Sequence, residues 1–163
     1  IFYGLFIRLS NLVLDLWGLI FLQSALVIFL LLNLARSICP NLSQRVTLLW
    51  IFIVGLTTSV PWFVSQISAD IFTSCLFMTM IILALNCERN SFRNVIFLGA
   101  LLILEVCMHS GNLIIGFMLL SCIVLILWLQ KRSWSYIKKF SVIAMTSFVI
   151  CFTSIVYGNE RQR

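Results

Sequence analysis

The segment Thr57–Cys75 (TTSVPWFVSQISADIFTSC) decides how the chain is divided, because it interrupts two long apolar runs. Pro61 ends or kinks a helix, and Trp62 is typical of a membrane–water interface. Gln66 and Asp70 place polar groups between two hydrophobic segments. A carboxylate between two membrane spans needs an explanation, so this segment is a candidate functional site.

The composition excludes an ordinary soluble domain. Of the 163 residues, 62% are hydrophobic and 10% are charged, with a mean hydropathy of +1.13. A soluble domain carries about a quarter charged residues. We therefore predict an all-α fold, a polytopic transmembrane helical bundle that forms one domain over residues 1–163. Its expected partner is the lipid bilayer and not nucleic acid, so the net charge of +6 is interpreted as membrane topology.

Apolar runs separated by polar loops predict about six spans. They cover residues 16–35, 46–64, 71–85, 95–108, 113–129 and 140–157, behind an interfacial segment at 1–15. Gln23 in the first span should face other helices and not lipid. The third and fourth runs reach only about 21–23 Å, against a hydrocarbon core of about 30 Å. Either their outer ends, near Asp70 and His109, are recessed, or helix tilt and bilayer thinning absorb the mismatch.

Basic residues predict the orientation. The loops 36–45, 87–94 and 131–139 hold eight Lys and Arg residues, whereas the opposite side holds Arg8, Arg161 and Arg163. The positive-inside rule then places both ends of the chain on the outer side. Because the chain begins at Ile1 without a signal peptide and ends directly after an apolar run, we expect it to be a fragment of a longer protein.

Asp70 has two compatible interpretations. At the start of the third span, it is suited to cap a helix N-terminus. Alternatively, it presents a carboxylate to an outward-facing cavity, with Thr73 and Ser74 on the same helical face.

Glu105 and His109 are the other ionisable candidates. Four residues apart, they share a helical face and can pair, either as a structural contact or as a functional site. His109 is the only histidine, and the six cysteines form no C-x-x-C pair, so no metal site is expected.

Three short patches carry a family resemblance. They are PWFVSQISADIF at residues 61–72, followed by an apolar span; MHSGNL at 108–113; and FYGLF at 2–6 together with Gln23. These patches resemble bacterial multi-spanning inner-membrane proteins of the GT-C glycosyltransferase-like type. Asn112 stands where the pattern of that family favours a second histidine.

The resemblance implies a transferase that moves a sugar from a polyprenyl-phosphate donor at the outer membrane face. The catalytic candidates are then Asp70, Glu105 and His109, and the substrate-binding candidates are Gln66, Asp70, His109 and Asn112. In this family the catalytic acid usually follows the first span, which would place it at or before residues 1–15 of this chain. Asp15 is therefore a remote candidate for the catalytic acid. Asp70 would then position the substrate. No cofactor is expected, with a divalent cation left open.

Two other functions remain open. In a transporter or flippase segment, Asp70 and the Glu105–His109 pair would be ion sites. In a non-catalytic membrane scaffold, every polar residue would be structural.

Overall fold

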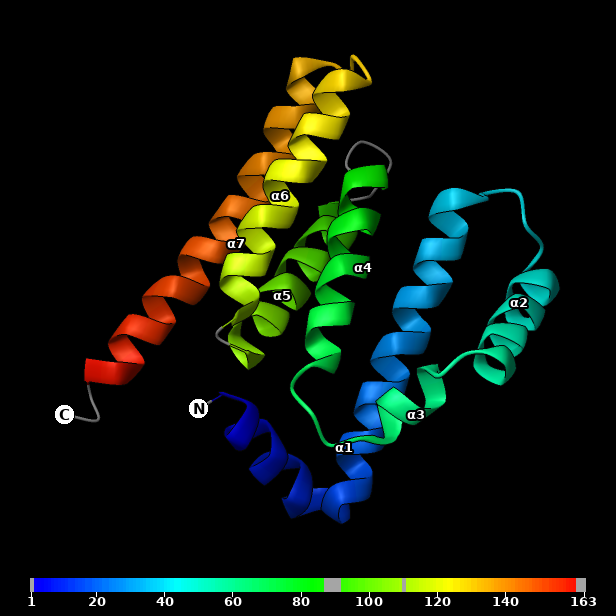
Figure 1. Ribbon diagram of the computed structural model, residues 1–163, viewed down its shortest axis with the longest axis vertical. Helices are drawn as coiled ribbons and strands as arrows, with labels where there is room; N and C mark the ends of the chain where they lie inside the picture. Colours follow the sequence, from blue (N-terminus) through cyan, green and yellow to red (C-terminus); the bar gives the residue numbers. More distant parts are fainter. Residues whose placement is uncertain (1, 87–91, 110, 161–163) are drawn as a thin grey trace.

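The computed structural model describes residues 2–86, 92–109 and 111–160 and confirms the all-α class (Figure 1). It is 88% helical, and the described residues form no strand. The helices are α1 (Phe2–Ile38), α2 (Gln44–Thr57), α3 (Val60–Ser65), α4 (Ile71–Asn86), α5 (Phe92–Met108), α6 (Gly111–Leu129) and α7 (Trp134–Glu160).

Helix α4 forms the centre of the bundle. Nine of its sixteen residues are buried, and it packs against α1, α5 and α6. At its first turn, the Phe72 ring makes edge-to-face contacts with Tyr3 and Phe6, at centroid distances of 6.2 and 5.8 Å. These contacts bring the start of α1 against the same end of the bundle as the segment that precedes α4.

Helices α6 and α7 form a hairpin, and both of them pack against α5 (Figure 1). Gly116 on α6 lies against the buried ring of Phe148 on α7. The hairpin turn closes with Arg132 N donating to Leu127 O at 3.1 Å and Lys131 N donating to Trp128 O at 2.9 Å. This is a Schellman motif, with Lys131 at φ 54° in the position that usually holds glycine.

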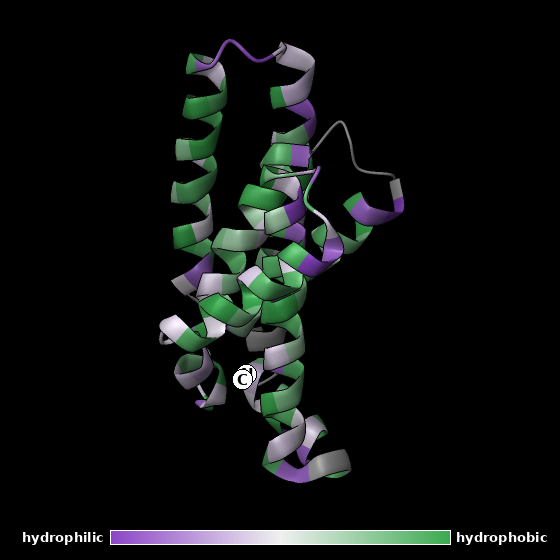
Figure 2. Cartoon of the chain, turned by 90° about the vertical axis from the view of Figure 1, so that its right-hand side faces the viewer, coloured by the Kyte–Doolittle hydropathy of each residue, from purple (hydrophilic) through white to green (hydrophobic). Residues whose placement is uncertain are grey.

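Three helical segments are long and apolar enough to cross a membrane: Asp15–Ile38, Gly111–Leu129 and Trp134–Tyr157. They coincide with the first, fifth and sixth predicted spans. Helices α4 and α5 have 16 and 17 residues, below the about 20 that a perpendicular span requires. Figure 2 shows hydrophobic residues along most of the helices and hydrophilic residues toward their ends and connections.

The predicted span 46–64 contains two helices, and the break between them lies before the one predicted at Pro61. Helix α2 ends at Thr57 and α3 begins at Val60. The hydroxyl of Thr57 donates to Ile53 O, and that of Thr58 donates to Val54 O, at 2.8 and 2.6 Å. Pro61 has no backbone N–H and fits the first turn of α3, where none is needed.

Two boundaries also differ from the prediction. Residues 2–15 of the predicted interfacial segment are helical and belong to α1, which changes direction near Asp15, a residue with φ 53° (Figure 1). Helix α7 begins at Trp134 and not at residue 140, because the Ser133 hydroxyl accepts from Tyr136 N at 3.3 Å and caps the helix.

Candidate functional site

The segment before α4 borders a cavity of about 230 Å³ between α1, α3 and α4. We call it the polar cavity. Its walls combine one carboxylate, one amide and hydroxyl groups with apolar side chains: Val27, Val60, Phe63, Val64, Gln66, Ser68, Asp70, Ile71, Ser74 and Met78. Two of the predicted site residues, Gln66 and Asp70, therefore line one site.

Asp70 directly precedes α4, and its backbone oxygen accepts from Thr73 N at 3.0 Å. Its carboxylate Oδ2 accepts from the Ser68 hydroxyl at 2.9 Å, and Asp70 N donates to the same hydroxyl at 3.2 Å. Asp70 thus occupies the N-cap position of α4. In the described structure, however, its carboxylate accepts a hydrogen bond from Ser68 in the loop and not from a backbone amide of α4. Sequence reasoning missed Ser68, although a hydroxyl two residues before an aspartate is a common turn signal.

Gln23 fixes the loop that carries Gln66. Gln23 is buried, as predicted. With its amide nitrogen facing the two carbonyls, it donates to Val64 O and Gln66 O at 3.2 and 3.3 Å. Burial raises the pKa of Tyr3, and the nearby charge of Asp70 raises it further.

Glu105 belongs to a second polar cluster inside the bundle. The side chain is fully buried, and Oε1 accepts from Thr79 Oγ1 at 2.8 Å. Within the described structure, Oε2 has no hydrogen-bond partner. Asn112 closes the cluster: its Nδ2 donates to Glu105 O at 2.8 Å and its Oδ1 accepts from Thr73 at 2.6 Å. The cluster therefore joins α4, α5 and α6.

The predicted pair of Glu105 and His109 does not form. Helix α5 ends at Met108, so His109 lies in the connection to α6, where it is exposed. Glu105 instead turns toward Thr79 on α4. Of the two hydroxyl residues one turn after Asp70, Ser74 lines the polar cavity with it, whereas the Thr73 hydroxyl donates to Asn112.

An apolar groove adjoins the polar cavity. It encloses about 360 Å³ between α1, α2 and α3 and is lined by Ser24, Val27, Ile28, Leu31, Ile51, Phe52, Val54, Gly55, Leu56, Val60, Pro61 and Val64. Val27, Val60 and Val64 line both spaces. The two spaces are therefore neighbours, one with polar groups in its wall and the other almost wholly apolar.

Among the residues described, no group of three or more His, Cys, Asp or Glu side chains is placed to hold a metal ion. The chain matches no known protein-family model, and no curated protein and no solved structure is significantly similar to it. The functional argument therefore depends on the geometry of this chain.

Proposed function

We propose that this chain is part of a multi-pass, GT-C-like membrane glycosyltransferase that moves a sugar from a polyprenyl-phosphate donor at the outer membrane face. The observation that supports this proposal is the polar cavity that shares Val27, Val60 and Val64 with the apolar groove. An amphiphile with a sugar at one end and a prenyl chain at the other matches both surfaces. The chain would be a component of the bacterial inner membrane.

The polar cavity suits a sugar because it offers directional hydrogen-bonding groups. Gln66 can both donate and accept, whereas the Asp70 carboxylate accepts hydroxyl protons. Asp70 would position the sugar or act as general base on an acceptor hydroxyl while the polyprenyl phosphate leaves. Since Asp70 would repel the donor phosphate, a divalent cation between them is part of the proposal.

The charge distribution supports the orientation. The described basic residues at the end of the bundle opposite Asp70 are Arg36, Arg45, Arg93, Lys131, Arg132, Lys138 and Lys139. By the positive-inside rule that end faces the cytoplasm, and the polar cavity faces outward. In the proposed arrangement the chain crosses the bilayer six times, with α4 and α5 as short spans and α2–α3 as a broken one.

Photo-cross-linking and transfer assays test the proposal on the full-length protein. A photoreactive polyprenyl-phosphate sugar should label the wild-type groove. Gly55→Trp should block labelling, because a Cβ at Gly55 meets no atom within 4 Å and the ring can enter the groove. Ile126→Trp on the exposed face of α6 is the matched control and should label normally.

Asp70→Asn separates binding from chemistry. We expect labelling to persist while sugar transfer falls at least about 100-fold, which is the usual contribution of a general base or of substrate positioning. Normal transfer by a correctly folded Asp70→Asn protein would remove Asp70 from the mechanism. Equal labelling of the wild type and Gly55→Trp would refute the groove as the prenyl site.

One observation favours the second candidate, a proton-coupled transporter or flippase. A carboxyl that is fully buried in a bundle, with one oxygen unpartnered in the described structure, is typical of a group that exchanges a proton between two conformations. Under this alternative, Glu105→Gln would abolish pH-dependent solute or lipid movement in proteoliposomes, and the wild type would show no sugar transfer. A scaffold would tolerate both changes.

A further inference from the structure

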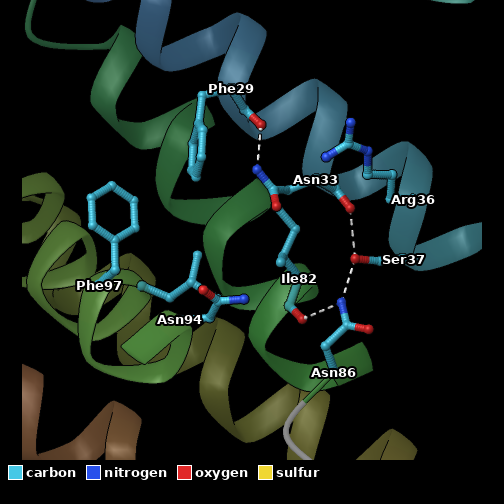
Figure 3. A pocket seen from close by; sticks show the side chains of 9 residues that line it. Phe29, Asn33, Arg36, Ser37, Ile82, Asn86, Asn94 and Phe97 are labelled. Atoms are coloured by element: carbon cyan, nitrogen blue, oxygen red, sulfur yellow. Dashed lines mark hydrogen bonds between the residues drawn. The ribbon is translucent and has the colours of Figure 1, made fainter. Parts of the chain in front are cut away.

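A separate cavity of about 210 Å³ lies between α1, α4 and α5, at the end of the bundle away from Asp70 (Figure 3). Polar side chains from three helices meet there with two aromatic rings. The lining residues are Phe29, Asn33, Arg36, Ser37, Ile82, Asn86, Asn94, Phe97 and Leu98.

A chain of hydrogen bonds holds part of this lining in place. Asn33 Nδ2 donates to Phe29 O at 2.8 Å, and the Ser37 hydroxyl donates to Asn33 O at 2.6 Å. Asn86 Nδ2 donates to both Ser37 Oγ and Ile82 O, which occupies both of its N–H groups. These side chains fix α1 against α4 and give the cavity a rigid wall.

Arg36 and Asn94 have donors to spare. Neither side chain makes a hydrogen bond or ion pair within the described residues, so the guanidinium offers five N–H groups and the amide offers two. In Figure 3 the Asn94 amide extends from α5 into the space between α1 and α4. Arg36 is the one charged side chain among the residues that line the cavity, and it is a cation.

One flank of the cavity is apolar and exposed. The Phe29 and Phe97 rings meet edge to face at 5.3 Å. Both rings stay substantially exposed, 36% for Phe29 and 53% for Phe97, on helices that present apolar surfaces outward. A ligand with an anionic head and hydrocarbon chains would satisfy the donors and cover these rings together.

We propose that this cavity binds the phosphate group of an anionic glycerophospholipid. Arg36 and Asn94 donate to the phosphate oxygens, and the acyl chains lie along Phe29 and Phe97. Charge-assisted hydrogen bonds of this type are the strong ones in phosphate recognition, and a membrane surface rich in anionic lipid supplies the ligand. This site is independent of the proposed transferase site, which lies at the other end of the bundle.

Native mass spectrometry of the full chain in detergent tests the proposal, with dioleoylphosphatidylglycerol and dioleoylphosphatidylcholine as probes. We expect the wild type to retain the anionic lipid about tenfold more tightly than the zwitterionic one. Arg36→Gln should remove that preference. Arg45→Gln is the matched control, because it deletes an exposed cation at the same end but outside the cavity, and it should keep the preference.

Asn94→Leu provides an independent variant. Asn94 is exposed, so its replacement should not disturb folding, and the affinity for the anionic lipid should fall several-fold. In the last experiment, inorganic phosphate and glycerol phosphate are added as competitors of the bound lipid. If either displaces the lipid at equal concentration, the cavity is a site for free phosphate and the lipid assignment is overturned. Equal retention of both lipids, or an equal loss in Arg36→Gln and Arg45→Gln, would also overturn it.

Discussion

Thr79 on α4 donates a 2.8 Å hydrogen bond to the Glu105 carboxylate on α5, inside the buried core. Asn112 on α6 bonds the backbone oxygen of the same Glu105. Burying polar groups is tolerable only when they are hydrogen-bonded to one another. These contacts therefore set how α4, α5 and α6 lie against one another.

Removing the Thr79 hydroxyl should destabilise the bundle. Thr79→Val keeps the side-chain shape but leaves a buried carboxyl without its donor, and we expect a loss of about 1–3 kcal/mol in the free energy of unfolding. Thr79→Ser keeps a hydroxyl and should lose less. Denaturant titration in detergent micelles measures both. Equal stability of the valine and serine variants would mean that the hydrogen bond contributes nothing.

A side chain at Gly116 should disrupt the contact between α6 and α7. A Cβ there would lie 2.6 Å from Phe148 Cε1, closer than van der Waals contact allows. Because the Phe148 ring is buried, Gly116→Ala should lower stability by about 1–3 kcal/mol. Gly55→Ala is the control, with no atom within 4 Å of its Cβ, and it should be neutral or stabilising. Adding Phe148→Leu to Gly116→Ala should recover part of the loss.

Cys107 on α5 and Cys151 on α7 should cross-link. Their Sγ atoms lie 2.7 Å apart, within reach of a bond after a small movement. Copper phenanthroline, a mild oxidant that accepts the two electrons, should give an intramolecular disulfide seen as a loss of two hydrogens by mass spectrometry. Cys107→Ser should abolish the product. Cross-linking of Cys107 to another cysteine instead would contradict the packing of α5 on α7.

Replacing Lys131 by glycine should stabilise the α6–α7 turn. Lys131 has φ 54°, a conformation that costs a residue with a Cβ about 1 kcal/mol and glycine almost nothing. We expect Lys131→Gly to raise the free energy of unfolding by about that amount. Lys138→Gly, in the helix interior, should do the opposite. Thermal unfolding in micelles measures the stability of both variants against that of the wild type, and a Lys131→Gly protein no more stable than the wild type would contradict the prediction.

Cys39 reports the proposed orientation. It is exposed, just past the end of α1 and beside the basic residues. In intact cells, a membrane-impermeant maleimide should leave it unlabelled and should react only after the membrane is opened. Ser68→Cys in a Cys39→Ser background should show the reverse, since Ser68 borders the polar cavity. Labelling of Cys39 in intact cells would show that this end of the bundle faces outward, which contradicts the proposed orientation.

Much of the architecture followed from local chemistry. Low charge and long apolar runs predict membrane helices, because the backbone must satisfy its own hydrogen bonds in lipid. Pro61 and Lys131-Arg132 marked real breaks, and Gln23 was correctly expected inside. The exact place of the break in 46–64 was not predicted, because it falls at Thr58 and Ser59, before Pro61, where the Thr58 hydroxyl accepts from Val60 N at the start of α3.

Composition and apolar runs were enough to predict the all-α class and helices apolar enough to cross a membrane. Spacing along a helix placed Glu105 beside His109, and only the tertiary structure turned Glu105 toward Thr79 and left His109 in the connection. It also gave Asn112 a buried structural contact and brought Gln66 and Asp70 to one cavity. The physical reason is that partners far apart in the chain meet only through helix packing, which periodicity along one helix does not encode.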